Sequence, residues 1–251
     1  MSLKYVIVGF LVTGGMLGLV SCRAAWAADR PQWGERHSRN MVSGETGLPA
    51  SFGPKTGEHI LWSAPLGDHG YCSAAVVAGD KVLIGANNAQ PRDPKHQGDR
   101  GVLLCLNEKD GRLCWQLVVP RIAEDHRMDW PEIALCSPPT VENGRVYVLT
   151  NRYEVACLDL AGLANGNDGP YKDEGRHMAP QDQPAMEPGP TDADILWLFD
   201  IPAEVGIYMH DSAFSSILLD GPYLYLNTCN GVDNPSHKYV QSPDAASLIV
   251  L

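Results

Sequence analysis

Apolar runs alternate with short polar turns along much of the chain, a pattern typical of antiparallel β-strands. The clearest example is residues 101–116, where an apolar run is followed by the polar segment 107–111 and by a second apolar run that carries Trp115. Gly111 lies in the polar segment, as a tight turn between two strands favours. This stretch therefore predicts a β-hairpin.

Two units of the chain have the same order of four predicted strands. The predicted strands span 72–77, 81–86, 103–106 and 113–118 in the first unit, and 136–141, 145–150, 154–159 and 195–200 in the second. Cys72 corresponds to Cys136, and Asn87 corresponds to Asn151. In the second unit, residues 161–194 delay the last strand, and this insertion is too rich in Pro, Gly and Asp to predict a core element.

A third unit has predicted strands at 215–219, 223–226 and 247–251. Residues 56–62 contain a turn glycine followed by Trp62 but no preceding strand, so we expect a lone strand that completes another sheet. Residues 28–55 are polar and rich in turn formers, which predicts an extended N-terminal arm. Internal repetition of this kind predicts an all-β protein of several similar sheets.

The repeated order of a strand ending in Leu-Asn or Leu-Asp, a turn glycine and a tryptophan resembles the PQQ-like (pyrroloquinoline quinone-type) β-propeller repeat family. The resemblance covers residues 56–251 and depends on the recurrence of Trp62, Trp115 and Trp197. It implies a β-propeller of four-stranded antiparallel blades, with about two complete blades, a partial third and an N-terminal closing strand, in which these tryptophans dock successive blades. Propellers close with about four to eight blades, so we expect the chain to be the N-terminal part of a longer propeller.

Activity is left open by this resemblance, because the family includes both quinone- and calcium-dependent alcohol dehydrogenases and propellers without known activity. The resemblance implies a disulfide between adjacent cysteines beneath the quinone of the dehydrogenases, and the 7 cysteines of this sequence include no adjacent pair. We therefore expect a non-catalytic binding or scaffold module, for which no cofactor is assigned. The alternative is a quinoprotein alcohol dehydrogenase that uses PQQ and calcium.

The N-terminus has the features of a signal peptide, since Lys4 precedes a long apolar run and small residues follow. Residues 19–22 resemble a bacterial lipobox, which would place a lipid anchor on Cys22, whereas residues 25–27 fit an ordinary signal-peptidase site. Both alternatives make residues 1–27 a leader and predict an exported protein in the periplasm or cell envelope. A membrane contact is expected only through a lipid at Cys22.

The net charge is -11 at pH 7, and removal of residues 1–27 would make it more negative because they contain Lys4 and Arg23 but no acidic residue. An acidic surface disfavours nucleic acid and anionic lipid as partners. The partner classes that remain are a protein, a glycan or a small ligand.

The cysteines have no CxxC spacing, so they predict neither a zinc site nor a redox motif. If Asn107 pairs with Arg112 across the hairpin turn, Cys105 faces Cys114. A cross-strand disulfide and two free thiols are both compatible with that register. We favour free thiols that pack beside Trp115.

Long polar loops gather at one end of the predicted sheets, which we call the loop face: residues 87–100, 119–135, 202–213 and 227–246. Polar and ionisable residues precede or follow the inner strands there. From them we predict a ligand site formed by Asp68, His69, Glu132, His210, Asp211, Asn87 and Asn151, with Asp125, His126 and Asp129 nearby. A plainer interpretation is solvated loop charges, and no HxH or HxxE spacing specifies a metal. The sequence therefore identifies no catalytic residue and no metal.

The insertion contains the sequence Asn-Gly-Asn-Asp-Gly at 165–169, followed by Asp173 and Glu174. This composition is common in calcium-binding loops, but the acidic residues do not occupy EF-hand positions. We interpret the segment as an Asx-rich turn.

Overall fold

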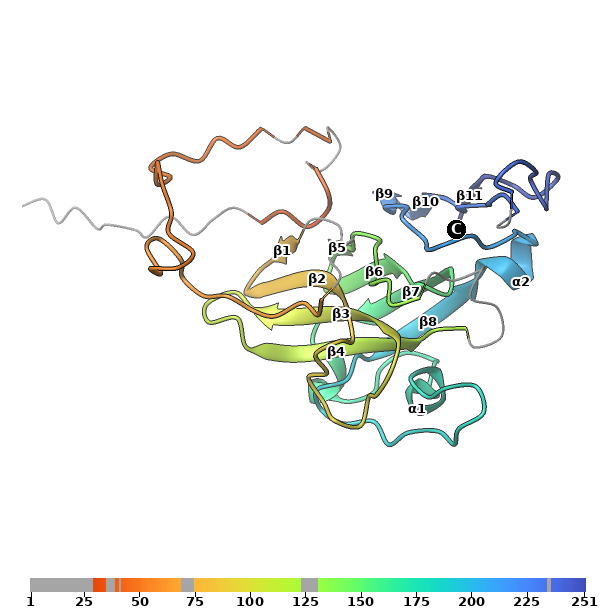
Figure 1. Cartoon of the computed structure of the whole chain (residues 1–251), viewed down its shortest axis with the longest axis horizontal. Helices are drawn as coiled ribbons and strands as arrows, with labels where there is room; N and C mark the ends of the chain where they lie inside the picture. The colour runs from red at the N-terminus through yellow and green to blue at the C-terminus, as the bar shows by residue number, and fades with distance from the viewer. Residues whose placement is uncertain (1–28, 35–38, 41, 69–74, 123–130, 234–235) are drawn as a thin grey trace, which may run out of the picture.

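The structure is a computed structural model that describes residues 29–34, 39–40, 42–68, 75–122, 131–233 and 236–251 (Figure 1). Its strands form three antiparallel sheets that follow one another along the chain. The first sheet contains β1 (Val76–Ala78), β2 (Lys81–Asn87), β3 (Arg100–Asn107) and β4 (Leu113–Pro120). The second contains β5 (Thr140–Glu142), β6 (Arg145–Leu149), β7 (Glu154–Asp159) and β8 (Ile195–Asp200). The third contains β9 (Leu218–Asp220), β10 (Tyr223–Asn227) and β11 (Leu248–Val250).

Within each sheet, strands that are neighbours in sequence are also neighbours in space. The helical segments are short: α1 (Glu174–His177), α2 (Ile201–Val205) and a 3-10 turn at Gly162–Asn165. The predicted all-β class and the four-stranded antiparallel sheets are therefore confirmed. Closure of the sheets into a propeller stays a prediction.

The β3–β4 hairpin contains a β-bulge that the sequence did not predict. Cys105 pairs with Trp115, whereas the next pair is Leu106 with Leu113, so Cys114 is the extra residue. The predicted pairing of Cys105 with Cys114 is therefore wrong by one position. Both residues are free thiols, which agrees with the favoured alternative.

The β7–β8 pair repeats this bulge at the equivalent place. Cys157 pairs with Trp197, and Leu196 is the extra residue before Trp197. A bulge increases the local twist of a sheet, so both outer hairpins are twisted in the same way. Trp197 is half-buried, and its ring centroid lies 6.2 Å from that of Tyr147.

Trp115 connects the first sheet to the second. Its side chain is completely buried, and its Nε1 donates a hydrogen bond to the carbonyl oxygen of Leu160 at 2.9 Å. The indole packs on Gly162, whose φ is +65°, and a Cβ at that position would lie 2.6 Å from an indole carbon. Glycine at this turn is thus required by both the backbone conformation and the close approach.

Trp62 makes the same kind of contact with the first sheet. Its Nε1 donates to the carbonyl oxygen of Glu108 at 2.7 Å, and its ring packs on Gly111, where φ is +69°. The predicted strand at 56–62 is nevertheless absent from the strands of the described residues. Residues 53–58 instead form a turn closed by a single bridge.

Both faces of the first sheet are buried. On β3, Leu103 and Cys105 point into the core between the first and second sheets. The alternate residues Val102 and Leu104 pack on the opposite face, against Trp62 and its neighbours. A separate core joins the second sheet to the third, so the sheets pack face to face in sequence order.

The N-terminal arm runs beside the first strands of two sheets. Arg30 forms an isolated bridge with Val77 of β1, with backbone hydrogen bonds of 2.9 and 3.0 Å. The carbonyl oxygen of Pro31 accepts a hydrogen bond from the backbone N–H of Val141 in β5 at 2.7 Å. The described part of the arm forms no helix or named strand.

The insertion in the second sheet contributes to the core, contrary to the sequence-based expectation. Residues 191–193 lie beside β4, where the backbone of Gln116 bonds Thr191 and Ala193 at 2.9 Å each, and Ala193 is a core residue. Lys95, from the loop after β2, forms a 2.6 Å ion pair with buried Asp192. The loop after β2 and the insertion together cover the outer edge of β4. Without them, the backbone groups along this edge would be unpaired and exposed.

Candidate functional site

A cavity of about 310 Å³ lies where β2 ends at the loop face. The end of β2, the loop after it and the segment before the second sheet form its wall. The lining residues are Asp68, Asn87, Asn88, Ala89, Pro91, Gln97, Gly98, Asp99 and Glu132. The structure thus brings together three residues predicted from the sequence, Asp68, Asn87 and Glu132, although they come from separate segments.

Asn87 is the residue that connects the segments. Its buried side chain donates from Nδ2 to Oδ1 of Asp68 at 2.8 Å and to the carbonyl oxygen of Glu132 at 2.9 Å. Its Oδ1 accepts a hydrogen bond from the backbone N–H of Asp68 at 3.3 Å. Because these bonds occupy the carboxamide, Asn87 positions the wall of the cavity and leaves ligand contacts to its neighbours.

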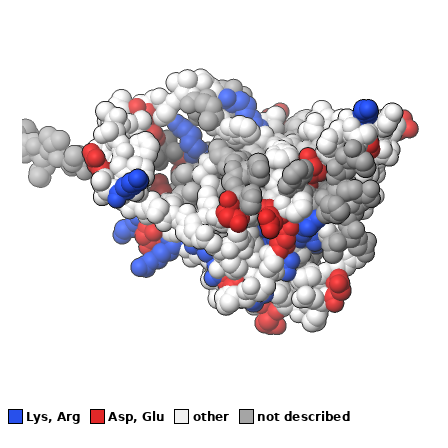
Figure 2. Space-filling model, viewed as in Figure 1, with Lys and Arg blue, Asp and Glu red and all other residues white. Residues whose placement is uncertain are grey.

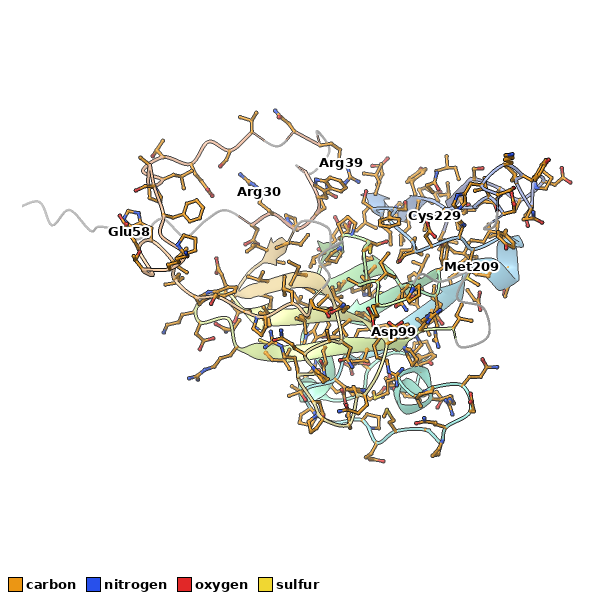
Figure 3. The ribbon with its side chains drawn as sticks, in the orientation of Figure 1. Arg30, Arg39, Glu58, Asp99, Met209 and Cys229 are labelled. Carbon is orange, nitrogen blue, oxygen red and sulfur yellow. The ribbon has the colours of Figure 1, made fainter. Side chains whose placement is uncertain are left out.

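Asp99 is a cavity residue that the sequence analysis missed. It lies directly before β3 (Figure 3), and its Oδ2 accepts a hydrogen bond from the backbone N–H of Glu132 at 2.8 Å. Arg121 Nη1 lies 3.5 Å from the same oxygen. The only sequence signal was its position at the end of the polar loop 87–100.

Glu132 has a strained backbone and an exposed side chain. Its φ is +59°, in the left-handed region that costs a non-glycine residue roughly 1–3 kcal/mol. The bonds from Asn87 and to Asp99 hold this conformation. Strained residues of this kind cluster at binding sites, and Glu132 is an exposed residue that lines the cavity.

The cavity is rich in hydrogen-bond acceptors. Three carboxylates (Asp68, Asp99 and Glu132) and three carboxamides line it, with Arg121 beside one of them. None of its lining residues is Ser, Cys, His or Lys, so a nucleophile or general acid on this wall could only be one of the carboxylates. Such a wall suits a ligand that donates hydrogen bonds through hydroxyl or ammonium groups.

His210 and Asp211 lie elsewhere, near the third sheet. His210 Nε2 lies 3.3 Å from Asp211 Oδ2, and the His210 ring packs edge-on against that of His237 with centroids 4.9 Å apart. Asp211, like Glu132, precedes the first strand of its sheet and has a φ of +59°. These residues do not line the cavity.

Asn151 also lies outside the cavity. It lies just after β6, as Asn87 lies at the end of β2. Its side chain is buried, and its Nδ2 lies 3.4 Å from the carbonyl oxygen of Val119 near the end of β4. The positions of His69, Asp125, His126, Asp129 and the leader with Cys22 fall outside the described residues.

Comparison with known proteins assigns no relative: no protein-family model matches the chain, and a search of curated proteins gives no match. Figure 2 shows acidic and basic side chains interspersed on the visible face. Within the part of the chain that the structure describes, no helix has the length and apolarity needed to span a membrane.

Proposed function

We propose that this chain belongs to an exported β-propeller of the PQQ-like repeat type and acts as a non-catalytic binding or scaffold module through its loop face. Two features support the propeller: the first two sheets share strand order and bulge position, and Trp62 and Trp115 make the same turn contact. Export to the periplasm or cell envelope rests on the leader sequence.

The acceptor-rich cavity carries the functional part of this proposal. Carboxylates and carboxamides on a wall positioned by Asn87 are suited to hydroxyl groups, and the carboxylates add attraction for a protonated amine. A short glycan, with an amino sugar bound most tightly, is the ligand that this wall fits best. Binding without turnover is part of this proposal. Because a pair of carboxylates can hydrolyse a glycosidic bond, release of monosaccharide from the disaccharide would contradict it.

Calorimetric titration of the purified full-length protein tests this proposal with two matched ligands, a glucosamine disaccharide and its N-acetylated form. We expect both to bind and the protonated form to bind more tightly. In Glu132→Gln, the loss of a charge-assisted bond worth roughly 1.5–3 kcal/mol should remove about tenfold or more of the affinity for the amine. Asp182→Asn, an exposed position in the insertion, is the control and should bind like the wild type.

Two further outcomes contradict the proposal. Absence of binding by both disaccharides would remove the glycan ligand. Dye-linked alcohol oxidation after reconstitution with PQQ and calcium would favour the quinoprotein alternative instead.

A further inference from the structure

Three carboxylates from separate segments meet on the side of the second sheet that carries the insertion. Asp159 ends β7, Asp168 lies in the insertion, and Asp194 directly precedes β8. One oxygen from each lies within 4.8 Å of the others. Backbone bonds fix the arrangement, because the N–H of Asp168 donates to Asp194 Oδ2 at 2.8 Å and the N–H of Asp159 donates to the Asp194 carbonyl at 3.0 Å.

Asp194 supplies a second, independent observation. Its side chain is completely buried, yet its Oδ1 has no hydrogen-bond partner. Nearby Glu174 is only 2% exposed, and its Oε1 also has none, while its Oε2 accepts from Asn167 at 2.8 Å. A buried carboxylate oxygen without a partner is costly, so this cluster lacks a positively charged group that would satisfy it.

Two cationic residues, Lys81 and Arg145, line a cavity together with Asp159 and Asp168. None of the ion pairs among the described residues includes Asp159, Asp168 or Asp194. The nearby Lys172 Nζ bonds the carbonyl oxygen and Oδ1 of Asn167, at 2.6 and 2.7 Å, and not a carboxylate.

The cluster is accessible from solvent and has a donor set typical of calcium. Asp159 and Asp168 line a cavity of about 650 Å³ that also contains Trp197. All three ligands are oxygens, which hard cations prefer. Mg²⁺ demands near-ideal octahedral geometry, whereas Ca²⁺ accepts irregular arrangements of carboxylate oxygens, so carboxylates from three separate segments suit the larger ion.

We propose that Asp159, Asp168 and Asp194 bind one Ca²⁺ ion, which fastens the insertion to the end of β7 and the start of β8. The ion neutralises the buried Asp194 and completes its coordination with water from the cavity. The site is independent of the loop-face cavity, since none of its three residues lines that cavity.

Terbium luminescence tests the site in the full-length protein after treatment with EDTA. Trp197 lines the same cavity as two of the ligands, so excitation of tryptophan should sensitise bound Tb³⁺, and Ca²⁺ should displace it at much lower concentration than Mg²⁺. We also expect Ca²⁺ to raise the melting temperature of the metal-free protein.

Asp194→Asn should abolish the luminescence and make the melting temperature insensitive to EDTA. Asp168→Asn changes an exposed side chain, so it should fold normally and weaken Tb³⁺ binding at least tenfold. Asp182→Asn, in the same insertion, is the control and should retain both responses. Absence of sensitised emission in the wild type, unchanged binding in Asp168→Asn, or equal displacement by Mg²⁺ and Ca²⁺ would overturn the proposal.

Discussion

Replacement of turn glycines by alanine can distinguish two causes of lost stability. One is the conformational cost of a left-handed alanine, and the other is a clash with the tryptophan ring. Gly162 and Gly144 both have left-handed φ angles, +65° and +75°. An alanine at Gly144 would meet nothing within 4 Å, whereas at Gly162 its Cβ would lie 2.6 Å from the Trp115 indole. The two variants therefore share the conformational cost and differ in the contact with tryptophan.

The expected magnitudes differ accordingly. A left-handed alanine costs about 1–2 kcal/mol, which is the full loss of stability expected for Gly144→Ala. Gly162→Ala adds overpacking against a buried ring, typically another 1–3 kcal/mol, and weakens the bond from Trp115 to the Leu160 carbonyl. In the Trp115→Leu background, this additional loss should largely disappear.

Urea denaturation followed by circular dichroism measures these losses by linear extrapolation. The same test applies to the Trp62 contact. Gly111→Ala should lose as much stability as Gly162→Ala, because its Cβ would also meet a tryptophan ring. Gly79→Ala has open space around it and should lose only as much as Gly144→Ala. Equal destabilisation of Gly162→Ala and Gly144→Ala would refute the view that tryptophan and glycine dock the sheets.

Three further predictions concern other parts of the molecule. Burial alone would raise the pKa of Glu154, but His177 and Arg152 lower it from 4.5 to about 2. The stability that ionised Glu154 contributes is therefore present above pH 4.5 and is lost as the pH falls towards 2. Acid denaturation of Glu154→Gln should lack this part of the pH dependence. Asn87→Ala should lower the free energy of unfolding by about 2 kcal/mol and weaken disaccharide binding, whereas intact affinity in calorimetry would exclude its positioning role. Cys105 should react with iodoacetamide in denaturant without reductant, and its recovery in a disulfide-linked peptide would contradict the free thiol.

Much of the strand pattern could be predicted because alternating apolar residues are a local property. The bounds of β7 and β8 coincide with the predicted 154–159 and 195–200. The bulge at Cys114 could not be found in this way, since an apolar strand with one extra residue retains a similar composition. The insertion was misjudged for a related reason: its core contact at Ala193 depends on backbone pairing with β4, which no local pattern encodes.

The sites also contain residues that the local sequence indicates and residues that only the folded chain brings together. Asp68, Asn87 and Glu132 were predicted from their places beside inner strands, and they line one cavity. His210 and Asp211 have similar places in the sequence, but the third sheet holds them away from it. The cluster of Asp159, Asp168 and Asp194 escaped because its members are brought together only when the insertion folds between β7 and β8.

A crystal structure of the purified full-length protein would test the central claim most directly. The account predicts a closed ring of four-stranded sheets in which β1, β5 and β9 face a common axis and the cavity at Asn87 opens at one end of that ring. Sheets stacked without closure, or a partner element that fills this cavity from within the same protein, would contradict it.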